Sequence, residues 1–118
     1  MMMTAAKSNR LLDSDFAAQR AGVLRALGNP VRLRIVALLS GSGETTVGAM
    51  AEALGLPQSS ISRQLAWLRL NELVDVRREG PFSYYSIAIP QLTDLLGCLE
   101  SCCREGTGGA PTDAGVGR

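Results

Sequence analysis

The sequence predicts a mostly α-helical domain with one small β-hairpin, an α+β arrangement of four helices, two strands and a last helix. Apolar stripes at helical spacing alternate with Gly, Pro and Asn breaks, and two runs of β-forming residues flank a glycine-containing turn. The chain has 118 residues, 46% of them hydrophobic, which is enough for one small core. Residues 13–105 are expected to fold, between a disordered N-terminal tail at 1–12 and a flexible C-terminal tail at 106–118.

The first two helices are predicted from their ends and from their apolar stripes. Residues 16–27 form the first, which ends at Gly28. Asn29 then supplies an N-cap and Pro30 stands at the first helical position of the second. Its apolar stripe consists of Val31, Ile35, Leu38 and Leu39. The small residues at 40–43 are expected to break this helix.

The next two helices form a closely spaced pair. Thr45 or Thr46 can cap residues 47–54, and Gly55 closes them. The following helix, at 57–71, has an apolar stripe for packing and a polar face over its first two turns. The stripe is Ile61, Leu65 and Leu68, and the polar residues are Gln58, Ser59, Ser60, Ser62, Arg63 and Gln64.

A hairpin and a last helix complete the predicted domain. Residues 73–78 and 82–88 are rich in β-formers and flank Glu79-Gly80-Pro81, which predicts a turn between two strands. The last helix, at 90–105, begins with a proline. Its leucine stripe consists of Leu92, Leu95, Leu96 and Leu99.

This order of elements describes a winged helix-turn-helix, which is a DNA-reading device. The N-terminal side chains of the helix at 57–71 would reach base edges in the major groove, where Ser, Gln and Arg discriminate base pairs. Arg77 and Arg78, near the hairpin turn, would neutralise phosphates or probe the minor groove. These two arginines and the six polar residues of the helix are therefore the predicted DNA-binding residues. The alternative for the six is an ordinary solvated helix face.

Composition excludes several other classes. The net charge of +1 excludes a generally basic nucleic-acid binder, and the absence of histidine removes imidazole-based catalysis and histidine zinc sites. The loop at 41–46 resembles a phosphate loop but lacks its lysine, and the chain has no Cys-x-x-Cys. We therefore expect no enzyme and no catalytic cofactor. No apolar run is long enough to span a membrane, so a cytoplasmic protein with reduced thiols is expected.

Two segments resemble the ArsR/SmtB family of metal- and metalloid-responsive repressors. Residues 57–68, followed by Glu72-Leu73-Val74 and by Arg77 to Tyr85, look like the family's recognition helix and wing, and residues 24–35 look like its opening motif. Arg63 departs from the family, which commonly has histidine there. The resemblance covers about residues 16–105. It implies a homodimer, built through the helices at 16–27 and 90–105, that represses from a palindromic DNA operator until an inducer releases it.

The cysteines are the candidate inducer site. Family members sense through a cysteine pair before the third helix, through Asp and His in the last helix, or through terminal cysteines; residues 46–49 hold no cysteine and the chain has no histidine. Cys98, Cys102 and Cys103 remain, and three thiolates suit trivalent arsenic or antimony. Cys103 is rotated by about 100° from Cys102 on a helix, so three sulfurs converge only if the last turn unwinds or the other subunit contributes one.

Other signals remain open for the same cysteines. A methylated trivalent arsenical needs only two thiols, a soft divalent metal such as cadmium or lead is another candidate, and oxidants or persulfides would act through a disulfide or a related bridge. Another alternative is that Cys103 is a buried apolar residue, because cysteine often packs as a hydrophobe, and that Cys98 and Cys102 are incidental, partly exposed thiols with no ligand. A protein that only dimerises is a further alternative, and the polar start of the helix at 57–71 argues against it.

Overall fold

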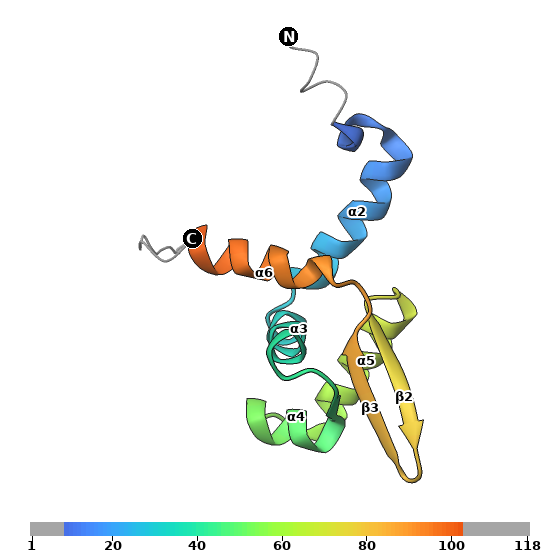
Figure 1. Cartoon of the computed structure of the whole chain (residues 1–118), viewed down its shortest axis with the longest axis vertical. Helices are drawn as coiled ribbons and strands as arrows, with labels where there is room; N and C mark the ends of the chain where they lie inside the picture. Colours follow the sequence, from blue (N-terminus) through green and yellow to red (C-terminus); the bar gives the residue numbers. More distant parts are fainter. Residues whose placement is uncertain (1–8, 103–118) are drawn as a thin grey trace.

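The computed structural model describes residues 9–102 of the chain (Figure 1), and residues 1–8 and 103–118 lie outside the described part. It confirms a mostly helical winged helix-turn-helix. The elements in order are η1 (Arg10–Leu12), α2 (Ser14–Leu27), α3 (Pro30–Ser42), β1 (Thr45–Thr46), α4 (Val47–Leu54), α5 (Gln58–Leu70), β2 (Val74–Glu79), β3 (Phe82–Ile87) and α6 (Gln91–Cys102). Within the predicted N-terminal tail, η1 is a single 3-10 turn, and the C-terminal tail lies outside the described residues.

Side chains at the helix starts satisfy amides that have no partner inside the helix. The carboxylate of Asp13 accepts from the Phe16 amide at 2.9 Å, and Thr46, rather than Thr45, caps α4. The predicted break at 40–43 is too early, because α3 continues through Ser42 and ends at Gly43, whose φ is +75°. Small exposed residues fit a last helical turn, and only the positive φ requires glycine.

The turn between α4 and α5 follows from one glycine. Gly55 has a left-handed conformation with φ +68°, and its amide donates to the Ala51 carbonyl. Pro57 is then the N-cap residue of α5, which begins at Gln58, and its own side chain makes no capping hydrogen bond. The stripe predicted for this helix is confirmed, because Ile61, Leu65 and Leu68 are fully buried. The opposite face of α5 is thereby turned outward.

The wing is a three-stranded antiparallel sheet in the order β1-β3-β2, where the sequence predicted two strands. Glu79 pairs with Phe82, so the turn has two residues, Gly80 with φ +60° and Pro81. Thr45 and Thr46 add the third strand by pairing with Tyr85 and Tyr84. Two residues are too short to show an alternating pattern in the sequence, which is why this strand was missed. Its effect is to join the wing to the start of α4.

The buried core lies where α3, α4, α5 and the base of the wing meet, with Ala26 and Leu27 from the end of α2 and Leu92 from α6. In Figure 1, η1 and the first half of α2 extend away from this body, and α6 lies across α3. The described chain measures 56 × 32 × 21 Å along its principal axes. Apolar side chains stay exposed on the projecting part and on α6, among them Leu11, Leu12, Leu24 and Leu99. One protomer therefore leaves an apolar surface over η1, α2 and α6.

Candidate nucleic-acid interface

The first two turns of α5 present most of the polar residues that the sequence singled out. Gln58, Ser59, Ser62 and Arg63 are exposed, and Ser60 is half-buried. Among the described residues no side chain caps the helix at Pro57, so the positive end of its dipole is not met by a capping side chain. This part of α5 combines side chains of the types that can contact base edges with a helix end that favours phosphate.

Gln64 is placed differently from the other five polar residues. Its side chain is half-buried, and its carbonyl oxygen accepts a hydrogen bond of 3.0 Å from Nη1 of Arg32 on α3. That bond directs the amide toward the protein body. The structure therefore places Gln64 behind the exposed face, as part of the contact between α3 and α5.

The two wing arginines have different surroundings. Arg77 donates two hydrogen bonds to Glu44, at 2.9 and 2.8 Å, and one of 2.6 Å to Glu79, and its guanidinium lies 4.8 Å from the Tyr84 ring centroid. Two carboxylates around one guanidinium give this cluster a net negative charge, which disfavours a further contact with phosphate. Arg78 is exposed, and within residues 9–102 its hydrogen-bond partner is the neutral Ser83 hydroxyl, to which it donates at 2.9 Å. Arg78 is thus the wing arginine whose charge remains available for DNA.

Glu44 is the functional neighbour that sequence reasoning missed. It lies 33 residues before Arg77 and comes directly before the strand β1, which brings it beside the wing. The Arg77 hydrogen bonds hold the pKa of the Glu44 carboxyl below its ordinary value of 4.5. No local pattern in the sequence marks this pair, because it depends on the pairing of β1 with β3.

The cysteines are only partly within the described structure. Cys98 is an exposed free thiol on α6, on a face shared with Asp94 and Ser101. Cys102 is the last residue of α6, one turn after Cys98, and Cys103 lies outside the described residues. Across the described part of the chain, no three His, Cys, Asp or Glu side chains are grouped so that they could hold a metal ion. The three-thiolate site therefore stays a prediction.

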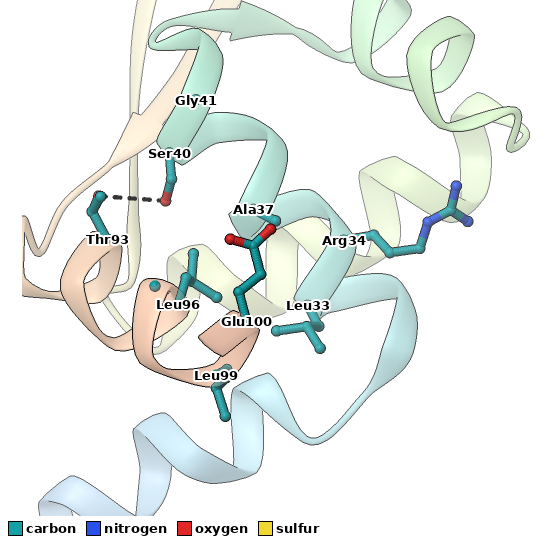
Figure 2. A pocket seen from close by; sticks show the side chains of 10 residues that line it. Leu33, Arg34, Ala37, Ser40, Gly41, Thr93, Leu96, Leu99 and Glu100 are labelled. Atoms are coloured by element: carbon teal, nitrogen blue, oxygen red, sulfur yellow. Dashed lines mark hydrogen bonds between the residues drawn. The ribbon is translucent and has the colours of Figure 1, made fainter. Parts of the chain in front are cut away.

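Two apolar grooves flank α6. One, of about 580 Å³, lies between α3 and α6 and is lined by Leu33, Ala37, Leu96 and Leu99 (Figure 2). At one end the Thr93 hydroxyl donates to Ser40 at 3.4 Å, and the Glu100 carboxylate lies over the groove. The other groove, of about 660 Å³, lies between α2 and α6 and includes Val23, Leu24 and Leu95. The second groove belongs to the apolar surface over η1, α2 and α6, and the first shares Leu99 with that surface.

The chain matches a family described as bacterial regulatory protein, arsR family, over residues 29–76. The HTH-type transcriptional regulator YgaV of Escherichia coli (strain K12) is 34% identical over 85 residues, which cover 72% of this chain and 86% of YgaV. The chain belongs to the ArsR family. A second relative, the nodulation protein NolR of Rhizobium meliloti, is 42% identical over 79 residues, and the match spans 67% of this chain and 64% of NolR.

Solved structures of ArsR-family relatives have the same fold. The homodimeric winged helix-turn-helix domain of Mb0332 from Mycobacterium bovis is 34% identical, with a TM-score of 0.68, and the match covers 80% of this chain and 85% of that one. The transcriptional repressor BigR from Xylella fastidiosa is 27% identical, with a TM-score of 0.70, and the match covers 86% and 96% of the two chains. This ArsR-family chain is a DNA-binding transcriptional regulator and not an enzyme, as the sequence predicted. In the part of the chain that the structure describes, no helix is long and apolar enough to cross a membrane.

Proposed function

We propose that the chain is a repressor that binds a palindromic operator as a homodimer and releases it when trivalent arsenic or antimony binds the thiolates of its C-terminal cysteines. The observation that carries the DNA-binding part is the exposed polar start of α5, which lies on the same protomer as the exposed Arg78 of the wing. Such a helix and wing fit one half-site, where the helix reads bases and the wing contacts phosphate.

The apolar surface over η1, α2 and α6 supports the homodimer. Leu12 is 81% exposed and Leu24 is 63% exposed, which is costly for a chain with so small a core. Mb0332, a similar chain, is described as homodimeric. A two-fold dimer presents two copies of α5, and therefore recognises a palindrome. We propose repression and not activation because the resemblance is to metal- and metalloid-responsive repressors and because BigR is described as a repressor.

The inducer proposal depends on where the cysteines lie. Cys98 is exposed on α6, and Cys102 follows after one helical turn. Soft thiolates without histidine favour a thiophilic ion such as trivalent arsenic. Since α6 packs on α3 and contributes to the proposed dimer surface, a ligand that distorts its last turn would change how the two α5 helices are spaced.

The test is fluorescence anisotropy of the reduced, full-length protein on a labelled duplex from its own upstream region, with arsenite added in steps. We expect tight binding that about one equivalent of arsenite per site reverses. Three variants, Cys98→Ser, Cys102→Ser and Cys103→Ser, should each bind the duplex like the wild type. In a three-thiolate site each of them should fail to respond to arsenite. Wild-type binding that arsenite leaves unchanged would refute the inducer proposal, and absence of binding would refute the operator proposal.

A two-thiol signal is the second candidate, because Cys98 and Cys102 lie one turn apart on α6 whereas Cys103 lies outside the described residues. Methylated trivalent arsenicals, and oxidants or persulfides, would need only such a pair, and a soft divalent metal such as cadmium or lead is a further candidate for the same thiols. In that case Cys103→Ser should respond like the wild type while Cys98→Ser and Cys102→Ser do not. Titration with methylated arsenite, with cadmium or lead, and with an oxidant then separates the signals.

A further inference from the structure

Arg32, near the start of α3, contacts two separate parts of the molecule, the end of α2 and the helix α5. Its Nε donates to the Ala26 carbonyl at 3.0 Å, and Nη2 donates to the Arg25 carbonyl at 3.4 Å. Its Nη1 donates to the side-chain oxygen of Gln64 on α5 at 3.0 Å. The same guanidinium lies 4.0 Å from the ring centroid of Trp67, one turn further along α5. One side chain therefore joins the end of α2 to the recognition helix.

The chemistry of arginine makes this contact directional. The guanidinium is planar and its donors have a fixed geometry, so the bond to α5 fixes the plane that also serves the two carbonyls of α2. The carbonyls of Arg25 and Ala26 belong to the last turn of α2, where carbonyls lack an amide four residues further on within the helix, and that of Arg25 also accepts from the amide of Gly28 at 3.2 Å. Stacking on Trp67 orients the group further. Lysine, with a single ammonium, could not make these contacts together.

The position of Arg32 gives the contact a role in DNA recognition. The helices α2 and α5 each pack against α3, and the Arg32 side chain adds a direct link between them. In the proposed homodimer, α2 forms part of the interface and α5 meets the DNA. The orientation of α5 relative to α2 therefore sets the distance between the two recognition helices.

We propose that Arg32 is a positioning residue that fixes the recognition helix relative to the dimer-forming helix α2, and so sets the operator spacing that the dimer accepts. Gln64 acts in this assignment as the acceptor for Arg32, and its effect on DNA recognition passes through the geometry of α5. The inference rests on the proposed function, since it concerns how the proposed dimer meets its operator.

The test uses the full chain and a series of operator duplexes in which the two half-sites are moved apart or together by single base pairs. Arg32→Lys keeps the charge but removes the planar guanidinium with its several donors. Gln64→Met keeps the length of the side chain but removes the oxygen that accepts from Arg32. Arg34→Lys is the matched control, because Arg34 also lies on α3 and donates to a backbone carbonyl, that of Leu54 at 2.9 Å. Sedimentation and thermal unfolding verify that each variant remains folded and dimeric.

We expect both variants to bind at least about tenfold more weakly at the optimal spacing, the size associated with removing a charge-assisted hydrogen bond. The decrease in affinity should be smaller at the other half-site spacings, so that the variants prefer the optimal spacing less strongly than the wild type does. The control should keep the wild-type profile. A double variant, Arg32→Lys with Gln64→Met, should bind little more weakly than either single variant, because the two changes remove one shared interaction.

Two results would overturn the inference. One is an equal decrease in affinity at every spacing, which would mean that Arg32 supports stability or charge alone. The other is a Gln64→Met variant that keeps the spacing profile but changes its preference at one base pair, which would assign Gln64 to direct base reading. If the wild type binds none of the duplexes, the proposed function itself fails, and that result differs from a wild type that binds with a profile unaffected by Arg32→Lys.

Discussion

Asn29 stabilises the start of α3 through two hydrogen bonds, accepting from the amides of Val31 at 2.9 Å and Arg32 at 3.0 Å. Asn29→Ala removes both, and we expect it to lower the free energy of unfolding by about 1–2 kcal/mol. Urea unfolding at a fixed protomer concentration measures this, since dimerisation makes stability depend on concentration. Asp13→Ala, which removes one exposed cap bond on α2, is the control and should cost less. Equal decreases in the free energy of unfolding of the two variants would contradict the larger contribution assigned to Asn29.

Arg78 is expected to contact phosphate. Among the described residues its partner is the neutral Ser83, whereas the charge of Arg77 is neutralised by two carboxylates, those of Glu44 and Glu79. Arg78→Ala should weaken binding to all duplexes and reduce the slope of log affinity against log salt by about 1 for each phosphate that the arginine no longer neutralises. Anisotropy titrations at several salt concentrations give that slope. Arg78→Lys keeps the charge and should keep the slope. An unchanged slope in Arg78→Ala would remove this residue from the interface.

Glu44 and Arg77 give a prediction about pH. The hydrogen bonds from Arg77 lower the pKa of Glu44 in the folded protein, so the stability from this pair is present above the ordinary pKa and is lost as the pH falls through the lowered value. Between about pH 6 and pH 8 the pair should therefore not titrate. Arg77→Gln should return the pKa of Glu44 toward 4.5, as followed by carboxyl carbon NMR. Arg78→Gln should leave the pKa of Glu44 unchanged. A shift of this pKa as large as that in Arg77→Gln would mean that the positive charge of the wing as a whole, and not the hydrogen bonds from Arg77, lowers it.

At the scale of elements, the two ends of α5 are expected to have different roles. Arg63 is exposed near the start of the helix, among the other polar residues, whereas Arg69 is exposed in its last turn. Arg63→Ala should reduce discrimination between the operator and an unrelated duplex by about 1–3 kcal/mol, the range for a base contact. Arg69→Ala should weaken binding to both duplexes equally or leave both affinities unchanged. Competition titrations measure the ratio, and the prediction fails if Arg69→Ala changes it more.

The wing as an element depends on more than its hairpin. β1 pairs with β3, and Glu44, beside β1, holds Arg77 of β2, so the loop before α4 is connected to two strands of the wing. Thr46 has two functions there, as a strand residue and as the cap of α4. The wing is thereby held in place beside the helix-turn-helix, which a free hairpin would not be.

At the scale of the whole molecule, the exposed apolar surface over η1, α2 and α6 predicts the assembly. Leu24→Glu places a charge on this surface, and we expect it to shift the protein from dimer to monomer and to lower operator affinity at least about tenfold, because two half-sites are then no longer joined. Analytical ultracentrifugation and anisotropy measure the two effects.

Leu70→Glu is the matched control for that variant. Leu70 is 82% exposed at the end of α5, outside the apolar surface over η1, α2 and α6. This control should remain dimeric. A Leu24→Glu variant that is still dimeric at the same concentration would show that the subunits meet elsewhere.

Local patterns along the chain are enough to predict the helices, the hairpin and the polar start of α5. Caps, glycines and apolar stripes act within a few residues, so Asn29, Gly55 and the stripe of α5 could be recognised without a structure. The same local patterns carried the resemblance to the ArsR family. They also placed Cys98 and Cys102 one turn apart on the last helix.

The fold divides the candidate residues in a way that no local pattern in the chain shows. It pairs Arg77 with Glu44, 33 residues away, and Gln64 with Arg32, 32 residues away, and so gives both side chains partners within the protein. It also shows which leucines remain exposed on η1, α2 and α6. This is because the guanidinium of an arginine binds whichever carboxylate, carbonyl or phosphate the fold brings within hydrogen-bond distance. The partner of each arginine is therefore determined by its neighbours in space and not by its neighbours in the chain.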